Sequence, residues 1–192
     1  MEVLRSGNAA ACSGTLVTPS VVVTAAHCIS QGATSIAVWT AALPGKGGKV
    51  AANYAIEATY PNPEWSAEGG LANEFLGSHV WDVGLLKLSS TVPAQVAQPR
   101  AMAHATTPKG TRMTVWGYGS AAAGTMKYYR SFAWDDNPCV ASPADSGGPV
   151  IREDTGEITR IYGAFDSVTN LDYTAPLDGN WDWIQKTLKD IE

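Results

Sequence analysis

The stretch Pro143-Ala144-Asp145-Ser146-Gly147-Gly148-Pro149 places one hydroxyl group between an acid and two glycines, after a proline that stiffens the approach. This pattern makes Ser146 a candidate nucleophile. A serine hydroxyl is a weak nucleophile at neutral pH, so the chain must also supply a base, a group that orients the base, and donors for an oxyanion. The alternative is a glycine-rich turn between strands, because Asp-Ser-Gly-Gly is good turn chemistry in any β protein. Other motifs must decide between the two.

His27 is the candidate base. It follows the apolar run Val21-Val22-Val23 within Thr24-Ala25-Ala26-His27-Cys28, so we expect it just beyond a strand, with small neighbours that leave the imidazole room to face a cleft. The other two histidines, His79 and His104, lie in a polar glycine-containing stretch and in a proline-flanked linker. We expect both to be ordinary surface histidines.

Asp82 is the candidate acid that orients the base. It precedes an almost wholly apolar segment, Val83-Gly84-Leu85-Leu86-Lys87-Leu88, which we expect to be a buried strand. An acid so close to a buried strand needs a partner, because burying a charge alone is costly. The structural alternative is that Asp82 caps a turn.

The chain carries a set of short motifs in a fixed order. They are Cys12-Ser13-Gly14-Thr15-Leu16, Ala25-Ala26-His27-Cys28, Asp82-Val83-Gly84-Leu85-Leu86 and Asp145-Ser146-Gly147-Gly148-Pro149. Together they resemble the trypsin/chymotrypsin-like serine proteases, in which histidine, acid and serine follow each other in this order along the chain. The similarity runs from about Cys12 to the C-terminal helix.

This resemblance implies both a fold and an activity. The fold would be all-β, with two packed antiparallel six-stranded β-barrels and a C-terminal helix. The activity would be that of a serine endopeptidase with a triad of His27, Asp82 and Ser146 and an acyl-enzyme intermediate. No cofactor and no metal ion would be needed.

The resemblance also implies where the oxyanion and the substrate bind. The backbone N–H groups of Ala144 and Ser146 would form the oxyanion hole. A peptide substrate would lie extended against a strand edge and pair with it through its main chain. The residues expected at this edge are Phe165, Asp166, Ser167 and Val168.

An α/β-hydrolase is a competing interpretation of the serine motif. Ala144-x-Ser146-x-Gly148 is one residue away from the Gly-x-Ser-x-Gly pattern of that fold, which requires a histidine after the serine. No histidine follows position 104. Chain order alone therefore excludes this alternative.

Composition limits the other function classes. The chain has 192 residues, of which 45% are hydrophobic, with 19 glycines and 11 prolines, as suits a β-rich globule with many turns. A net charge of −5 offers no basic patch for nucleic acid. No apolar run is long enough for a membrane span, and residues 1–5 lack the features of a signal peptide.

The three cysteines bear on location. The resemblance pairs Cys12 with Cys28, 16 positions apart, in a disulfide beside the histidine. On the loop-entropy model such a bridge stabilises the fold by about 3 kcal/mol. Disulfides persist in oxidising compartments, so the pair predicts an extracellular or periplasmic protein, whereas two reduced buried thiols are the alternative. Cys139 is left without a partner in the family pattern.

The chain divides into two halves at about residue 100. Residues 1–100 would form an N-terminal β-barrel with the histidine and the acid, and residues 101–192 a second barrel with the serine and a closing helix at 180–191. Asn180 or Asp178 would cap that helix. The strands that we expect cover 16–17, 21–25, 35–39, 50–59, 83–88, 112–118, 127–134, 149–152 and 158–165.

Two departures from the family pattern concern residues 144–148, called the serine loop below. The family has glycine where this chain has Ala144, and an alanine forced into a glycine-only backbone region costs roughly 1–3 kcal/mol. The family also often pairs the acid before the serine with a freed N-terminus, so Asp145 here needs another cation, for which Arg112 and Arg130 are the candidates.

Three aspartates bear on the specificity of the site. Asp135, Asp136 or Asp166 near the pocket would favour Arg or Lys side chains, although we expect surface positions for these aspartates rather than positions at the pocket.

The sequence leaves two hypotheses for the function. The first is a working endopeptidase that acts on polypeptides. The second is a catalytically impaired, protease-like binding module, or a zymogen-like domain that an activating partner or a protein inhibitor controls.

Overall fold

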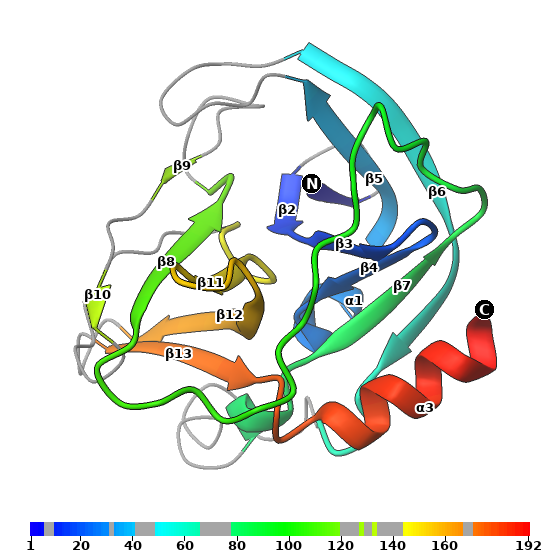
Figure 1. Cartoon of the computed structure of the whole chain (residues 1–192). Helices are drawn as coiled ribbons and strands as arrows, with labels where there is room; N and C mark the ends of the chain where they lie inside the picture. The colour runs from blue at the N-terminus through cyan, green and yellow to red at the C-terminus, as the bar shows by residue number, and fades with distance from the viewer. Residues whose placement is uncertain are drawn as a thin grey trace.

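The computed structural model describes residues 1–5, 10–30, 33–40, 49–65, 78–119, 127–128, 132–133, 144–166 and 171–192. Within these ranges most of the regular structure is β, in two antiparallel sheets that lie side by side (Figure 1). The strands of the first sheet all lie between residues 2 and 88, and those of the second between residues 112 and 176. The division of the chain at about residue 100 into two domains stays a prediction.

The first sheet runs in the order β2-β1-β5-β6-β7-β4-β3. Its strands are β1 (Glu2–Arg5), β2 (Ala10–Ser13), β3 (Thr15–Thr18), β4 (Val21–Thr24), β5 (Ala33–Thr40), β6 (Lys49–Pro61) and β7 (Gly84–Leu88). The two outermost strands, β2 and β3, are separated in sequence only by Gly14, so the sheet curls until its edges meet there. A Cβ atom at Gly14 would lie 2.8 Å from Cγ1 of Val22, so a glycine permits this close approach.

The second sheet has the order β10-β8-β11-β12-β13, with β9 also paired to β8. Its strands are β8 (Arg112–Gly117), β9 (Lys127–Tyr128), β10 (Phe132–Ala133), β11 (Pro149–Arg152), β12 (Ile158–Asp166) and β13 (Leu171–Pro176). The serine motif directly precedes β11, so the second sheet carries Ser146.

The predicted all-β architecture of two antiparallel sheets with a C-terminal helix is confirmed, and every expected strand overlaps an observed one. The first sheet differs in having seven strands in the described part of the chain, because β1 and β2 were not expected. Neither segment shows a clear period-two pattern, and Ala10-Ala11-Cys12-Ser13 consists only of small residues. The strand β13 was also missed, since it contains Asp172 and ends at Pro176.

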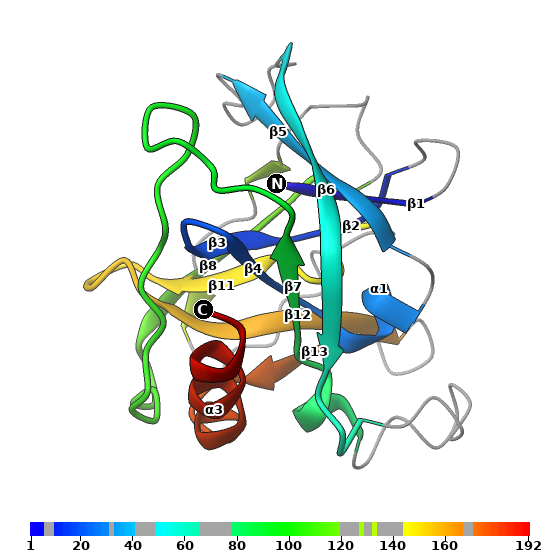
Figure 2. The same ribbon diagram turned by 90° about the vertical axis from the view of Figure 1, so that its right-hand side faces the viewer.

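Three short helical segments complete the described structure: α1 (Ala26–Ser30), η2 (Ser78–Trp81) and α3 (Trp181–Ile191). The helix α3 lies on the outside of the molecule, at the C-terminal end of the chain (Figure 2). Asn180 stands at the N-cap position, but its side chain makes no capping hydrogen bond. Of the two predicted caps, Asn180 and Asp178, the structure therefore has Asn180 at the N-cap position, while its amide makes other contacts, which are described below.

The apolar core continues from one sheet to the other. Buried residues of the first sheet, such as Leu85 and Leu86, belong to the same cluster as Ile158 and Ile161 of β12 and Ile184 of α3. A smaller cluster lies within the second sheet. In the described part of the chain, no helix is both long enough and apolar enough to cross a membrane.

Candidate active site

The register of the first sheet brings His27 to Asp82. Strands β4 and β7 are antiparallel, with Thr24 opposite Gly84. His27 follows the end of β4 and Asp82 precedes the start of β7, so both lie at the same end of this strand pair. A Cβ atom at Gly84 would collide with Cδ1 of Ile29, so glycine at this position lets α1 pack closely and hold His27 in place.

The Asp82 carboxylate binds His27 twice. Oδ1 accepts a hydrogen bond from the backbone N–H of His27 at 2.9 Å, and Oδ2 lies 2.7 Å from Nδ1 of the ring. The Asp82 side chain is 3% exposed, whereas that of His27 is 22% exposed. A carboxylate only accepts, so Nδ1 carries the proton and Nε2 presents its lone pair. This arrangement is that of an oriented base.

The backbone at Ser146 packs directly against the segment that leads to His27. The carbonyl of Ser146 accepts a hydrogen bond from the N–H of Ser13 at 2.7 Å. A Cβ atom at Gly147 would collide with Oγ1 of Thr24 and with the carbonyl oxygen of Ser13, and would lie 3.1 Å from the backbone N of Ala25. The glycine at 147, with φ of 81°, is therefore needed for this contact between the two halves of the molecule.

The Ser146 hydroxyl is hydrogen-bonded to a carbonyl group rather than to the imidazole. Oγ donates to the carbonyl oxygen of Gly163, at 2.9 Å. The Nε2 atom of His27 lies 3.6 Å from Sγ of Cys28. Within the described residues no hydrogen bond joins Ser146 to His27. The structure thus joins the candidate acid Asp82 to the candidate base His27, and brings Ser146 to the same region with its hydroxyl turned to β12.

The predicted disulfide joins Cys12 to Cys28, with 6.1 Å between the Cα atoms. It fixes the end of β2 to α1, next to His27. The sulfur atoms and a ring nitrogen of His27 lie within 4.8 Å of one another. Both sulfurs are bonded to each other, so neither offers the thiolate that a metal ion would require.

Ala144 adopts a left-handed backbone conformation, with φ of 74°. It is the only residue other than glycine with positive φ in the described ranges. Position 144, where the family has glycine, therefore holds an alanine in the backbone region that glycine adopts most readily. The N–H groups of Ala144 and Ser146 make no hydrogen bond to another described residue. Two such N–H donors on either side of Asp145 suit the binding of an anionic oxygen.

Asp145, which directly precedes Ser146 in the serine loop, is fully buried. Its Oδ1 accepts a hydrogen bond from the backbone N–H of Gly119 at 2.7 Å, and a Cβ atom at Gly117 would collide with this same oxygen. The suggestion that Arg112 is its cation is wrong, because the Arg112 side chain is 62% exposed and lies 3.5 Å from Glu153 instead. Arg130, the other candidate, lies outside the described residues.

Only part of the predicted substrate edge can be placed. The backbone of Phe165 and Asp166 lies at the end of β12, paired with Asp172 and Leu171 of β13. Ser167 and Val168 lie outside the described residues, as do Asp135, Asp136 and Cys139. His104 is exposed, and its ring contacts Trp181 at 5.5 Å between centroids.

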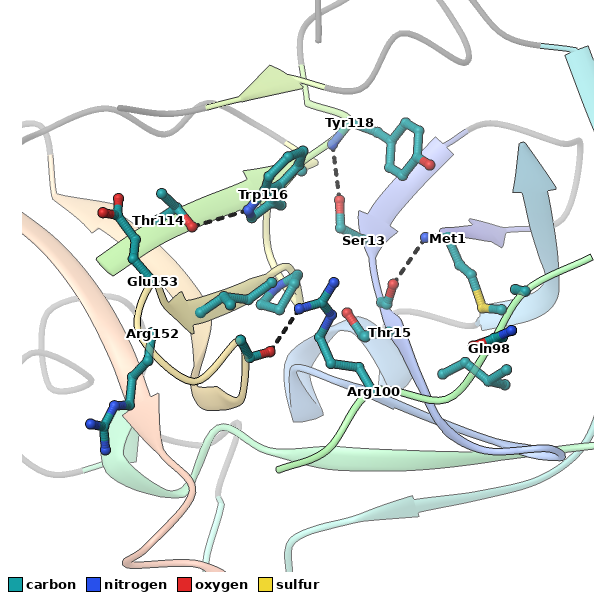
Figure 3. Close-up of a pocket in the computed structure, with 17 residues that line it drawn as sticks. Met1, Ser13, Thr15, Gln98, Arg100, Thr114, Trp116, Tyr118, Arg152 and Glu153 are labelled. Atoms are coloured by element: carbon teal, nitrogen blue, oxygen red, sulfur yellow. Dashed lines mark hydrogen bonds between the residues drawn. The ribbon is translucent and has the colours of Figure 1, made fainter. Parts of the chain in front are cut away.

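A cavity of about 480 Å³ opens between the two sheets (Figure 3), and His27 is not among the residues that line it. Strands β3, β8 and β11 and the linker around Arg100 line it, mostly with apolar atoms. Ser13 and Tyr118 face this cavity and are joined by a hydrogen bond, which Figure 3 shows as a dashed line. Ser13 therefore lies between the cavity and the serine loop.

Sequence reasoning missed three residues that shape this site: Ser13, Gly163 and Asn180. Gly163 acts through its carbonyl group, and Ser13 through its backbone groups as well as its hydroxyl, and such backbone contacts with distant segments leave little trace in sequence. Ser13 carried one signal, because a small polar residue between Cys12 and Gly14 within a buried strand must satisfy its hydroxyl group.

Comparisons with known proteins agree with this geometry. The Trypsin family model matches residues 1–173. Serine protease SP24D from Anopheles gambiae is 25% identical over 217 residues, which covers 97% of this chain and 75% of that protein.

Solved structures show the same fold. Neuropsin, a serine protease expressed in the limbic system of mouse brain, has a TM-score of 0.73 at 17% identity. The match covers 97% of this chain and 92% of the neuropsin chain. HL collagenase has a TM-score of 0.71 at 17% identity, with 98% of this chain and 91% of its own covered. The extent of the family match and the shared fold show that this chain belongs to the trypsin family of serine proteases.

Proposed function

We propose that the protein is a serine endopeptidase in which His27, Asp82 and Ser146 form the catalytic triad. The observation that carries this proposal is the double hydrogen bond of Asp82 to His27, at 2.9 Å to the backbone and 2.7 Å to the ring. In the neutral imidazole it leaves Nε2 as an acceptor, which is the state that a general base requires.

The reaction begins when the Ser146 hydroxyl leaves the carbonyl of Gly163 and turns to Nε2 of His27. His27 takes the proton as Oγ attacks the carbonyl carbon of the scissile peptide, and Asp82 stabilises the resulting imidazolium. The imidazolium then gives its proton to the leaving amine, and an acyl-enzyme remains. Water, activated by the same imidazole, releases the acid product and restores the serine.

The N–H groups of Ala144 and Ser146 bind the oxyanion in this proposal. Both groups are without a hydrogen bond to described residues, and both belong to the loop that also carries the nucleophile. Losing one such donor typically lowers the rate by about 10²- to 10³-fold. The left-handed backbone at Ala144 therefore matters directly for the rate.

The substrate is a polypeptide that binds as an extended strand along the end of β12. On the Ser146 side, β11 pairs with β12 only as far as Ile161, and hydrogen bonds from the serine loop continue to Gly163. Beyond Gly163 this side of the strand, toward Phe165, Asp166, Ser167 and Val168, is the proposed pairing edge. The buried disulfide favours action outside the cytoplasm, in an extracellular or periplasmic setting.

A catalytically impaired, protease-like module that an activating partner or an inhibitor controls is the second candidate. The observation in its favour is the resting bond from Ser146 Oγ to Gly163, combined with an alanine in a left-handed conformation at 144. In this alternative, the binding of a partner would be needed to complete the site.

Labelling with a fluorophosphonate distinguishes the two candidates. We expect the purified protein to gain one adduct on Ser146, measured by intact mass and peptide mapping. His27→Ala should abolish labelling. The matched control His104→Ala should label at the wild-type rate, because His104 is an exposed histidine whose ring lies near that of Trp181. An unlabelled wild-type protein, or equal labelling of His27→Ala, would contradict the endopeptidase proposal.

A further inference from the structure

Ser13 uses all of its polar groups to hold the surroundings of the serine loop. It is 2% exposed. Its N–H donates to the carbonyl of Ser146 at 2.7 Å, its hydroxyl donates to the carbonyl of Ala144 at 3.1 Å, and its own carbonyl accepts from Oγ1 of Thr24 at 2.8 Å. Ser13 thus binds the loop on both sides of Asp145, through two different groups.

The direction of the Ser13 hydroxyl is fixed. A hydroxyl has one proton to donate, and Oγ also accepts a hydrogen bond from the backbone N–H of Tyr118 at 3.1 Å. With the acceptor side occupied by Tyr118, the proton is committed to Ala144. Ser13 itself cannot drift, because Cys12 is joined to Cys28 by the disulfide.

The Ala144 carbonyl, which Ser13 binds, belongs to a residue in a costly backbone conformation. At φ of 74° the Cβ of an L-residue is crowded, so an alanine is disfavoured there unless its surroundings hold it. The φ and ψ angles of Ala144 together set how its N–H points relative to its carbonyl. A donor that holds the carbonyl therefore also holds the N–H, as long as Ala144 keeps its left-handed conformation.

We infer that Ser13 is a positioning residue for the oxyanion hole. Its hydroxyl holds Ala144 in the left-handed conformation that a glycine at position 144 would adopt unaided. This inference rests on the proposed function, because it assigns the Ala144 N–H to the oxyanion. Without the Ser13 hydroxyl, Ala144 leaves the left-handed region and its N–H no longer points with that of Ser146.

The test is a double-mutant cycle of Ser13→Ala and Ala144→Gly, with kcat and KM measured on a peptide ester and with the rate of fluorophosphonate labelling. S13A should lower kcat and the labelling rate by about 10- to 100-fold, part of the full loss of one oxyanion donor, and change KM by less than about twofold. In the A144G background the same change should cost less than about threefold, since glycine reaches positive φ unaided.

Thr159→Val is the matched control. Thr159 is a buried residue whose hydroxyl also donates to a backbone carbonyl, that of Val150 at 3.3 Å, but it has no hydrogen bond to the serine loop among the described residues. Its kcat should remain at the wild-type value. An equal loss from S13A in the wild-type and A144G backgrounds would show a merely structural role and overturn the inference, as would wild-type kcat in S13A.

Two further comparisons keep the outcome decisive. Should S13A fail to fold alone, S13A/A144G is compared with A144G, and a drop of more than about tenfold in kcat contradicts the inference. A wild-type protein that neither hydrolyses nor labels refutes the proposed function. In that case, the crystal structures of wild-type and S13A proteins test Ser13 alone: loss of the positive φ at Ala144 supports the inference, and its retention overturns it.

Discussion

At the scale of single residues, the site depends on groups that each perform two tasks. Asp82 holds both the backbone and the ring of His27, so the position and the tautomer of the imidazole have a common cause. An amide in place of this carboxylate has one acceptor oxygen and one NH2 group, which only donates. It cannot accept from both N–H groups of His27, and either the backbone contact or the Nδ1–H tautomer must be given up.

Asp82→Asn should therefore lower kcat by roughly 10⁴-fold, the size of effect that a wrong tautomer has in a serine–histidine–acid triad. We expect the unfolding midpoint in urea to fall far less than in Asp82→Ala, because the amide fills the same volume. Asp190→Asn, on the exposed face of α3, is the matched control and should leave kcat unchanged. Retention of more than about a tenth of wild-type kcat in Asp82→Asn would contradict the assigned role of Asp82.

The same scale shows what sequence could predict. His27, Asp82 and Ser146 each lie in a short motif with its own chemical logic, so the neighbouring residues were enough to predict each as a candidate site residue. Gly163 contributes only a carbonyl oxygen, which every residue possesses, and its role depends on the register of β12 against the serine loop. Ala144 lies between these cases, because its departure from glycine was visible and the φ of 74° then explained the consequence.

At the scale of elements, a buried pair of asparagines ties α3 to the segment before Asp82. Nδ2 of Asn180 lies 2.7 Å from the carbonyl of Val80 in η2 and 2.6 Å from that of Pro176, and its Oδ1 accepts from Nδ2 of Asn62 at 2.6 Å. Sequence suggested a local cap because Asn is common there. The competing long-range contacts could not be seen, since they join positions 100 and 118 residues apart.

Asn180→Ala should lower the free energy of unfolding by about 1–3 kcal/mol, because it leaves buried carbonyl and amide groups without partners. The measurement is urea unfolding followed by tryptophan fluorescence. Gln185→Ala, on the exposed side of the same helix, removes a polar side chain at a solvent-facing position and should change the free energy by less than about 0.5 kcal/mol. Equal effects of the two substitutions would show that the asparagine pair has no special role.

At the scale of the whole molecule, the two sheets share one core and one site. The main apolar cluster combines Leu85 and Leu86 of the first sheet with Ile161 of the second and Ile184 of α3. Ser13 and Ser146 join the halves by a backbone hydrogen bond. The division of the chain at about residue 100 stays a prediction. The sequence carried no information on this shared packing, which depends on how the sheets face each other.

Because of this shared core, we expect the protein to unfold in a single cooperative transition. Far-UV circular dichroism and tryptophan fluorescence should give the same midpoint and slope in urea. Leu86→Ala in the first sheet and Ile161→Ala in the second should each shift both signals together. Two separated transitions, or a substitution that moves only one signal, would show that the halves fold independently.

The contact between Asn180 and Val80 also sets an order on events at the ribosome. Val80 lies two positions before Asp82, and the asparagine that holds it is translated after the histidine, the acid and the serine. A nascent chain that has just released Ser146 from the exit tunnel therefore still lacks the anchor for the acid. We therefore expect the segment before Asp82 to reach its final position only after Asn180 has also emerged.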